Sequence, residues 1–211
     1  MNLEQTLRRG SAQLGLQLGS ETQARLLDYV ALLHKWNKVY NLTAIRDSEH
    51  MVSLHLLDSL AVLPHLWSGR WLDVGCGAGL PGVVLAIAQP DWQFTLLDSN
   101  SKKTSFVQQA IIELDLRNVG VCCARVEEFH TQKNFDGIIS RAFAELKDFF
   151  RLTRHLLAPQ GRWAAMKGLA ETEVVKVPDD CLVEQVVQLH VPGVAATRSL
   201  VIATRKGNQT A

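Results

Sequence analysis

The chain has 211 residues, of which 22 are basic and 21 acidic, giving a formal net charge of +1. Hydrophobic residues make up 47% and charged residues 20%, which is the balance of a globular protein and excludes extensive disorder. A near-neutral chain is not a polycation, so any nucleic-acid partner must be met by a local basic patch. The chain contains no run of about 18 apolar residues, so no transmembrane helix is expected.

The four cysteines indicate neither a disulfide framework nor a zinc site. They stand at positions 76, 122, 123 and 181, and none forms a C-x-x-C pair or has a histidine at zinc-ligand spacing. The first nine residues also lack the apolar segment of a signal peptide. We therefore expect reduced thiols, a cytoplasmic location and no bound metal.

The first third of the chain, residues 1–66, is predicted to be a helical N-terminal extension that packs on the main domain. One helix is expected over residues 20–36, because its apolar residues recur at helical spacing and Ser20 and Gln23 match a capping box. A further helix is expected over residues 48–64, where apolar residues again recur until a proline ends the pattern.

From residue 67 onward the pattern changes to alternating strands and helices, which predicts one α/β domain over residues 67–211. Alternation of this kind is typical of βαβ units, in which helices cover both faces of a parallel sheet. The two last β-rich runs favour an antiparallel end to the sheet. The predicted strands cover residues 70–74, 94–98, 119–123, 135–140, 162–166, 181–191 and 199–204, and the predicted helices cover 83–88, 102–114 and 146–157.

A glycine-rich loop follows the first predicted strand and opens the next helix, with glycines at positions 75, 77, 79 and 82. Glycines there allow positive φ and let a ligand approach the backbone, while free N–H groups at the helix start face the ligand. The dinucleotide fingerprint G-x-G-x-x-G fails in register with the strand because Leu80 occupies its third glycine position, and it matches only from Gly77. No Gly-Lys-Ser/Thr follows, so a P-loop is excluded. A plain strand–turn–helix without a ligand is the alternative interpretation.

Acidic residues stand at the ends of the first two predicted strands. Asp73 precedes the loop and could accept hydrogen bonds from the loop or from a cationic ligand. Asp98 lies about 20 residues beyond the glycines, where a carboxylate can hold both hydroxyls of a ribose. After the third strand, Val126 could pack on an adenine face and Glu127 could accept its amine, unless Glu127 belongs to a solvated helix start. Neither Asp73 nor Asp98 favours a triphosphate.

These residues together resemble the class I S-adenosylmethionine-dependent methyltransferases, and flanking motifs make the resemblance more specific. The motifs, in chain order, are residues 34–43 (HKWNKVYNLT), 55–59 (HLLDS), 80–82 (LPG), 97–99 (LDS), 140–143 (SRAF) and 166–168 (MKG). They resemble the bacterial ribosomal RNA small subunit methyltransferase G family, also called glucose-inhibited division protein B. The resemblance spans roughly residues 20 to 204, and members of that family methylate N7 of one guanine in 16S ribosomal RNA.

The resemblance implies a Rossmann-like, mostly parallel seven-stranded sheet with an antiparallel last strand, and S-adenosylmethionine as the cofactor. It implies no side chain that acts as acid or base, and Arg141 is the candidate for aligning cofactor or target near the methyl group. Cys76 stands where relatives carry a small polar residue, and its side chain is expected to point away from the pocket. The residues implied to bind the cofactor are Gly75, Gly77, Gly79, Leu80, Asp98, Val126, Glu127 and Arg141.

The end of the fourth predicted strand distinguishes between classes of methylation. Residues 140–143 lack the Asn/Asp-Pro-Pro-aromatic motif of enzymes that methylate exocyclic amines, and they provide no cysteine nucleophile for methylation on carbon. Guanine N7 has an in-plane lone pair and loses no proton, so alignment with the methyl group is sufficient. Phe143 could stack on a flipped-out guanine or be a core aromatic. The pair of His55 and Asp58 is interpreted as a surface or packing feature.

Six basic residues are candidates for RNA contacts: Lys35, Lys38, Arg46, Lys102, Lys103 and Lys167. They could form one basic face around the pocket, or each could be an ordinary solvated side chain. The expected partner is 16S ribosomal RNA, alone or as an assembling ribonucleoprotein, and a monomer without membrane association is expected. The alternatives left open are a methyltransferase of another RNA, a protein or a small molecule, a nicotinamide-dependent oxidoreductase, and an RNA-binding assembly factor with a vestigial pocket.

Overall fold

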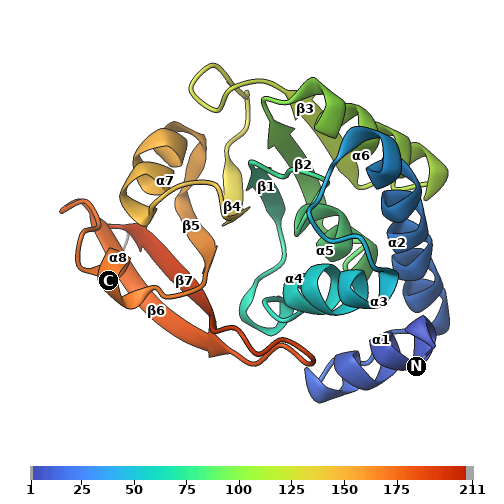
Figure 1. The fold of residues 1–211 in the computed structure, drawn as a ribbon. Helices are drawn as coiled ribbons and strands as arrows, with labels where there is room; N and C mark the ends of the chain where they lie inside the picture. Colours follow the sequence, from blue (N-terminus) through green and yellow to red (C-terminus); the bar gives the residue numbers. More distant parts are fainter. Residues whose placement is uncertain (1, 208–211) are drawn as a thin grey trace.

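A computed structural model describes residues 2–207, and its centre is one seven-stranded sheet (Figure 1). The strand order is β3-β2-β1-β4-β5-β7-β6. β1 pairs in parallel with β2 and β4, whereas β7 pairs antiparallel with both β5 and β6. The predicted α/β sheet with an antiparallel end is therefore confirmed. The strands are β1 (Arg70–Val74), β2 (Gln93–Asp98), β3 (Val119–Cys123), β4 (Phe135–Arg141), β5 (Leu157–Lys167), β6 (Cys181–Leu189) and β7 (Arg198–Arg205).

Helices cover both faces of this sheet. α5 and α6 lie on one face together with α2 of the N-terminal extension, and α7 lies on the opposite face (Figure 1). Neighbouring residues of β2 enter different cores, Leu96 with Phe106 of α6 and Leu97 with Phe149 of α7, because side chains alternate along a strand. The helices are α1 (Leu3–Gln13), α2 (Ser20–Tyr40), α3 (Ser48–Met51), α4 (Asp58–Leu60), α5 (Gly82–Ala88), α6 (Ser101–Glu113), α7 (Leu146–Thr153) and α8 (Glu171–Val174), with a π-helical turn η1 (Val52–Leu57) and 3-10 turns η2 (Leu63–His65) and η3 (Arg154–Leu156).

The N-terminal helices share a core with one face of the sheet. Leu26 and Tyr29 of α2 are fully buried and belong to one apolar cluster with Phe106. The ring of Phe106 also contacts Tyr29 and Trp36, with centroid separations of 6.3 and 5.8 Å. Burying a large apolar side chain contributes roughly 2 kcal/mol. These contacts fix α2 relative to the sheet.

The start of α2 differs from the sequence prediction. Gly19 is the N-cap residue and no side chain caps this end of the helix, so the predicted capping box at Ser20 is wrong. Gln23 instead donates from Nε2 to the carbonyl of Leu18 at 2.8 Å. The structure also contains α1, which had no counterpart among the predicted helices.

Two other predicted helices have different lengths in the structure. The helix predicted over residues 48–64 is interrupted by η1, a π-helical turn of a kind that often occurs at functional sites. The helix predicted over residues 146–157 ends at Thr153 and continues as the 3-10 turn η3, after which Leu157 pairs with Phe135 of β4 and begins β5. Pairing with a neighbouring strand therefore overrides the local helical pattern at that point.

Candidate active site

The glycine loop joins β1 to α5 and lies at the carboxyl edge of the sheet. Gly75, Gly77 and Gly79 have φ values of 68°, 57° and 90°, which glycine adopts more readily than any other residue. The backbone N–H groups of Gly75 and Cys76 donate to the carbonyl of Leu97 at 2.8 and 3.1 Å. These bonds hold the loop against the end of β2.

Two carboxylates accept hydrogen bonds from backbone N–H groups of the loop. Asp73 Oδ2 accepts the N–H of Gly82 at 2.8 Å, and Asp98 Oδ2 accepts the N–H of Gly77 at 2.9 Å. Asp73 is fully buried, its Oδ1 has no hydrogen-bond partner among the described residues, and burial raises its pKa from 3.8 to about 7. Asp98 Oδ1 accepts the N–H of Asn100. Because each carboxylate oxygen has two lone pairs, Asp98 can still accept hydrogen bonds from a ligand.

Helix α2 is joined to the same loop by a buried hydrogen bond. The hydroxyl of Tyr29 donates to the carbonyl of Ala78 at 2.6 Å. Burial raises the pKa of Tyr29, so the hydroxyl stays protonated and can donate. The sequence interpretation missed this residue, since a tyrosine in a helix gives no sign of a partner 49 residues away.

A first cavity of about 410 Å³ lies beside the loop, at the carboxyl ends of β1 and β2. Four of the residues predicted to bind the cofactor line it, namely Gly75, Asp98, Val126 and Glu127. Val126 is buried and presents an apolar surface there, while Asp98 and Glu127 contribute carboxylates. The structure thus brings together residues that the sequence places at or just beyond the ends of three different strands.

The other predicted cofactor residues do not line this first cavity. Leu80 is buried in the core, and Gly77 and Gly79 shape the turn without lining the cavity. Cys76 is buried and does not line the cavity either, in agreement with the expectation that its side chain points away. Arg141 lines a second cavity.

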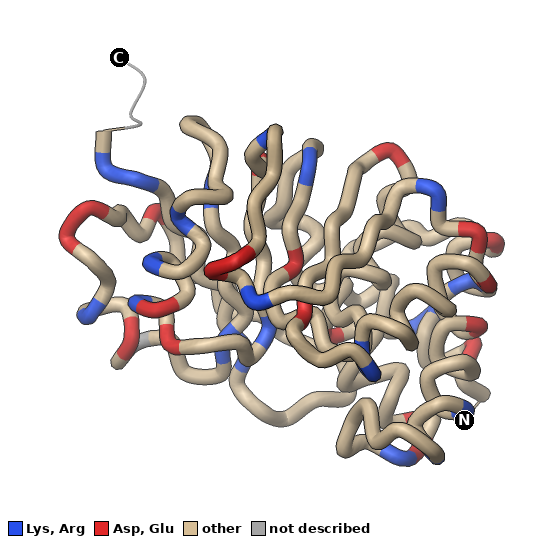
Figure 2. Tube along the Cα trace, turned by 90° about the horizontal axis from the view of Figure 1, so that it is seen from above, with Lys and Arg blue, Asp and Glu red and all other residues tan. Residues whose placement is uncertain are grey.

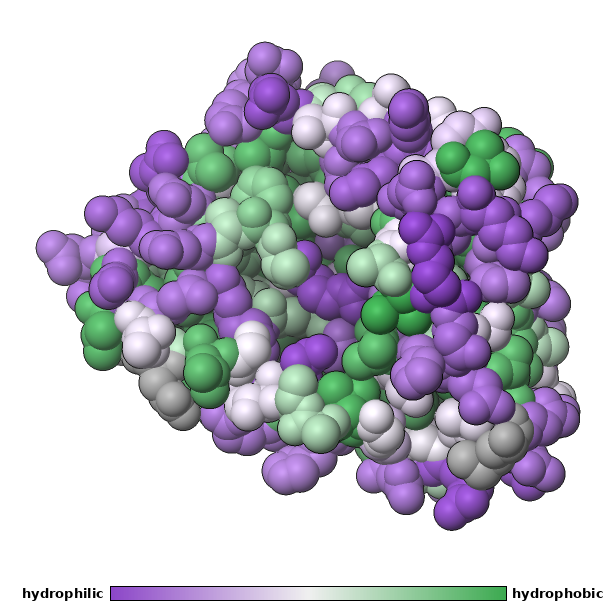
Figure 3. Space-filling model, in the orientation of Figure 1, coloured by the Kyte–Doolittle hydropathy of each residue, from purple (hydrophilic) through white to green (hydrophobic). Residues whose placement is uncertain are grey.

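The second cavity has a volume of about 470 Å³ and lies between the end of β4 and the N-terminal helices. Its walls combine the apolar side chains of Ile45, Leu54 and Met166 with the guanidinium groups of Arg141 and Arg198. Figure 3 shows the molecule hollowed near the middle of this face, between α7 and the N-terminal helices. Cavities of this size and mixed character are typical of sites for small ligands or single bases.

One buried carboxylate holds both arginines of the second cavity. Asp58 Oδ1 accepts from Nε of Arg198 at 2.8 Å, and Asp58 Oδ2 accepts from Nη1 of Arg141 at 3.1 Å. The Asp58 side chain is 4% exposed, against 27% for Arg198 and 22% for Arg141. Hydrogen bonds between charged groups are stronger than neutral ones, so this carboxylate sets the position of both guanidinium groups.

His55 of η1 lines the same cavity. Its Nε2 lies 3.0 Å from Thr43 Oγ1, and its Nδ1 lies 3.1 Å from the carbonyl of Leu54. Burial and then the Arg141 cation lower the pKa of His55 to about 4, so the ring is neutral near pH 7. His55 and Asp58 are both buried, which agrees with the packing interpretation and contradicts the surface one. They are not an isolated pair, because both line the cavity and each bonds to other partners. The sequence signal for a role of His55 and Asp58 at the site was their position in the flanking motif of residues 55–59.

The segment that follows β4 separates the two cavities. Arg141 and Ala142 line the second cavity, whereas Phe143 and Ala144 line the first. Ala142 has a φ of 56°, a left-handed conformation that is uncommon outside glycine and frequent at functional sites. Phe143 lines the first cavity, and its ring also meets the ring of the core residue Phe149 edge-on at 6.4 Å. Stacking of Phe143 on a target base stays a prediction.

The candidate RNA-contacting residues lie in different surroundings. Lys35 borders a surface depression together with the acidic Glu113, and Lys38 follows about one turn later on α2. Lys102 and Lys103 belong to the first turn of α6. Figure 2 shows basic and acidic positions interspersed along the chain. A single basic face around the pocket stays a prediction.

Two of these candidates are engaged within the chain. Arg46 donates from Nη1 to the carbonyl of Asn37 at 3.0 Å. Lys167 forms an ion pair with Glu173 at 2.8 Å, also donates to the carbonyl of Ala144, and is 13% exposed. Glu173 compensates the charge of Lys167, and the bond from Lys167 to the Ala144 carbonyl stabilises the segment after β4. A contact between Lys167 and RNA stays a prediction.

Membrane spans and metal-binding clusters are both absent from the part of the chain that the structure describes. No helix there is long and apolar enough to cross a bilayer. No group of three or more histidine, cysteine, aspartate or glutamate side chains among these residues could hold a metal ion. All four cysteines are free thiols.

Comparison with known proteins gives one consistent family. A family model described as rRNA small subunit methyltransferase G matches residues 22–201. The ribosomal RNA small subunit methyltransferase G of Laribacter hongkongensis is 54% identical over 202 residues, covering 95% of this chain and 98% of the relative. The protein of the same name from Neisseria meningitidis is 51% identical over 208 residues, covering 98% of this chain and 100% of the relative.

Solved structures show the same fold class. A SAM-dependent methyltransferase from Aquifex aeolicus superposes with a TM-score of 0.57 at 22% identity, covering 71% of this chain and 90% of that chain. This likeness confirms the predicted class I methyltransferase fold, and the family rests on the closer relatives. From the family model and these relatives together, the chain belongs to the rRNA small subunit methyltransferase G family.

Proposed function

We propose that this chain methylates N7 of a guanine in 16S ribosomal RNA, with S-adenosylmethionine as the methyl donor. Membership of the rRNA small subunit methyltransferase G family makes it an rRNA methyltransferase. The proposal is carried by one observation, the pair of cavities on either side of residues 141–144. The first cavity offers acceptors for a nucleoside cofactor, and the second offers donors and apolar walls for a base. A methyl group would be transferred from a cofactor in the first cavity to a base in the second, past residues 141–144.

The first cavity suits S-adenosylmethionine. The Asp98 carboxylate would hold the ribose hydroxyls, Val126 would pack on the adenine, and Glu127 or the neighbouring backbone would accept the adenine amine. Gly75 has a positive φ and lines this cavity, and a glycine there would let the cofactor approach the loop backbone. When bound, the cofactor supplies a methyl group on a cationic sulfonium. The acidic groups at this edge of the sheet favour a cation over a triphosphate.

The second cavity suits a reaction that needs no general base. Guanine N7 would attack through a lone pair in the ring plane, and the new N–C bond would form as the methyl–sulfur bond breaks, with no proton moved. His55 has both ring nitrogens within hydrogen-bond distance of Thr43 and Leu54, so it has no free nitrogen to accept a proton from the substrate. Arg141 is tied to Asp58 and acts by alignment.

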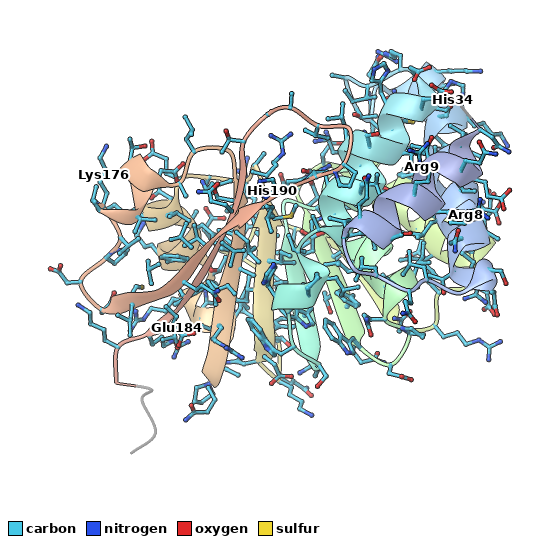
Figure 4. All side chains as sticks on the ribbon, turned by 90° about the horizontal axis from the view of Figure 1, so that it is seen from below. Arg8, Arg9, His34, Lys176, Glu184 and His190 are labelled. Carbon is cyan, nitrogen blue, oxygen red and sulfur yellow. The ribbon has the colours of Figure 1, made fainter. Side chains whose placement is uncertain are left out.

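Basic groups of the N-terminal helices and of the α6 start are proposed to contact the RNA. Lys35 and Lys38 on α2 are the candidates there, and Figure 4 shows Arg8 and Arg9 of α1 near His34 of α2 at the same end of the molecule. The protein is proposed to act as a monomer in the cytoplasm. Its substrate is proposed to be 16S RNA, alone or in an assembling ribonucleoprotein.

The deciding experiment compares ribosomal RNA from cells with and without this protein. N7-methylguanine makes RNA sensitive to cleavage by borohydride followed by aniline, so one 16S cleavage site should be present only when the protein is made. Incubating the purified chain with S-adenosylmethionine and the unmethylated RNA should restore that site. A methyl group on an exocyclic amine or on carbon, or no methylation at all, would contradict the proposal.

A further inference from the structure

The second cavity contains hydrogen-bond donors that have no partner among the described residues. Arg141 donates from Nη1 to the carbonyl of Leu54 and to Asp58, both at 3.1 Å. Arg198 donates from Nε to Asp58 and from Nη1 to the carbonyl of Thr197. Within residues 2–207, Nη2 of neither arginine makes a hydrogen bond, although both side chains line the cavity. A guanidinium has five N–H donors, so each arginine retains donors for a ligand.

The surroundings of these donors favour a base over a phosphate group. Ile45, Leu54 and Met166 line the cavity with apolar groups, against which a phosphate would lose its hydration and a flat ring would not. Asp58 already compensates one of the two guanidinium charges, which weakens the attraction for an anion. Guanine presents O6 as a hydrogen-bond acceptor on the same edge as N7. The donors therefore match the edge of the base that carries the reacting atom.

We propose that Arg141 and Arg198, both held by Asp58, donate hydrogen bonds to O6 of the target guanine and thereby select guanine over adenine. This inference rests on the proposed function, because it requires the target base to enter the second cavity with N7 directed to the first. O6 is the acceptor, since a donor on N7 would occupy the lone pair that attacks the methyl group. Adenine carries an amino group in place of O6, and its N–H groups would face those of the arginines.

Asp58 is the positioning residue of this arrangement. Its carboxylate gives each guanidinium a fixed anchor, at 2.8 Å for Arg198 and 3.1 Å for Arg141, so little ordering is left for the moment when the base binds. It also provides a negative charge beside a ring that becomes cationic when N7 is methylated. Without that carboxylate, two guanidinium charges would oppose the product ring.

Base analogues at the target position of 16S RNA test this contact. Ligated RNAs would carry guanosine, inosine or 2-aminopurine riboside there; inosine keeps O6 and N7, and 2-aminopurine keeps N7 without O6. With the full-length wild-type chain, single-turnover methylation of inosine should be within about 3-fold of that of guanosine, and 2-aminopurine should react about 100-fold more slowly.

Variants assign the discrimination to named residues. Arg198→Ala should lower the ratio of guanosine to 2-aminopurine rates by about 10-fold or more, and Arg198→Lys, which keeps the charge without the fork, should give an intermediate ratio. Asp58→Asn keeps the size of the side chain and should lower the same ratio without changing the affinity for S-adenosylmethionine. Arg117→Ala is the matched control and should leave the ratio unchanged, because Arg117 pairs with Asp115 at the surface and does not line the second cavity.

The ratio separates base recognition from other roles of these arginines. A loss of folding, or of a phosphate contact, would slow all three RNAs equally and leave the ratio unchanged. A wild-type chain that methylates guanosine and 2-aminopurine at equal rates, or a ratio that persists in Arg198→Ala and Asp58→Asn, overturns the inference and leaves the proposed function standing. Calorimetric titration with S-adenosylmethionine tests that function separately, and a wild-type chain that binds none overturns both.

Discussion

The hydroxyl of Tyr29 donates a 2.6 Å hydrogen bond to the carbonyl of Ala78 and so joins helix α2 to the glycine loop. Both residues are buried. The loop beside the first cavity is therefore held by the N-terminal helices as well as by β1 and β2. This relationship gives the N-terminal extension a part in shaping the proposed cofactor site, in addition to its proposed contacts with RNA.

Replacing Tyr29 with Phe should lower the free energy of unfolding by about 1–2 kcal/mol, because the Ala78 carbonyl would stay buried without a partner. The affinity for S-adenosylmethionine should fall by roughly 3- to 10-fold, because the loop loses its hydrogen bond to α2. Urea unfolding and calorimetric titration measure the two effects. Tyr40→Phe is the matched control, because Tyr40 is 44% exposed on the same helix. Unchanged cofactor affinity in Tyr29→Phe would show that the loop keeps its shape without α2.

Replacing Asp98 with Ala should weaken binding of S-adenosylmethionine by about tenfold or more, because hydrogen bonds to a charged group contribute roughly 1.5–3 kcal/mol. Asp98→Asn keeps one carbonyl acceptor for the N–H of Gly77 and should lie between the wild type and Asp98→Ala. Calorimetry gives the affinities, and circular dichroism confirms that both variants fold. Wild-type affinity in a folded Asp98→Ala chain would remove Asp98 from the site.

Asp73 should make stability depend on pH with a definite sign. Its pKa is raised by burial from 3.8 to about 7, so between these values the folded chain holds a proton that the unfolded chain has released. The free energy of unfolding therefore falls as pH rises through this window, by at most about 1.4 kcal/mol per pH unit, and levels off above it. Asp73→Asn does not titrate, so its stability relative to the wild type should increase from about pH 5 to about pH 8.

His55 makes stability depend on pH in the opposite direction, so wild type must be compared with Asp73→Asn to isolate the effect of Asp73. Burial lowers the pKa of His55 from 6.5 to about 4, so its contribution to stability is present above that window and is lost as pH falls through it. The wild-type curve contains both effects, whereas the difference between wild type and Asp73→Asn isolates Asp73. Urea unfolding at each pH measures that difference. A difference that stays constant with pH would mean that Asp73 does not titrate there.

Changing Lys35, Lys38 and Arg46 together to Ala should weaken RNA binding and reduce its dependence on salt, since fewer counterions are released from the phosphates. Affinity for S-adenosylmethionine should stay within about 2-fold, because none of the three lines the first cavity. Filter binding at several salt concentrations measures the effect.

A triple variant of Arg117, Lys133 and Lys176 removes the same charge elsewhere and serves as the control. Figure 4 shows Lys176 at the end of the molecule opposite the N-terminal helices. Equal loss of RNA binding in the two triple variants would indicate an effect of net charge alone. Normal methylation by the first variant would limit the extension to a structural role.

The rate of methyl transfer should be nearly independent of pH between about 6.5 and 9, because no group has to act as a base in that range. Single-turnover measurements at saturating S-adenosylmethionine and RNA report this step. A rate that rises steeply with pH would instead require a base.

Arg141→Ala should lose at least about tenfold in rate while remaining folded, because its guanidinium aligns the target.

Local sequence patterns are sufficient to predict the sheet and the glycine loop of this protein. The alternation of strands and helices predicts the sheet, since each element depends on side-chain periodicity along a few residues. The glycine loop and Asp98 are recognisable because a turn and the strand that follows it have a fixed spacing. Val126 and Glu127 follow the third strand, and the structure brings them to one cavity with Gly75 and Asp98.

The second cavity could be found only from the tertiary structure. Asp58 binds Arg141, 83 residues away, and Arg198, 140 residues away, and no local pattern encodes such pairs. Tyr29 and Ala78 are separated by 49 residues in the same way. These contacts arise where helices from the N-terminal extension pack against strand ends, and the energy of a buried charge or hydroxyl depends on what packing places beside it. Sequence therefore determined the sheet and its glycine loop, and packing between distant segments decided which charged groups surround the second cavity.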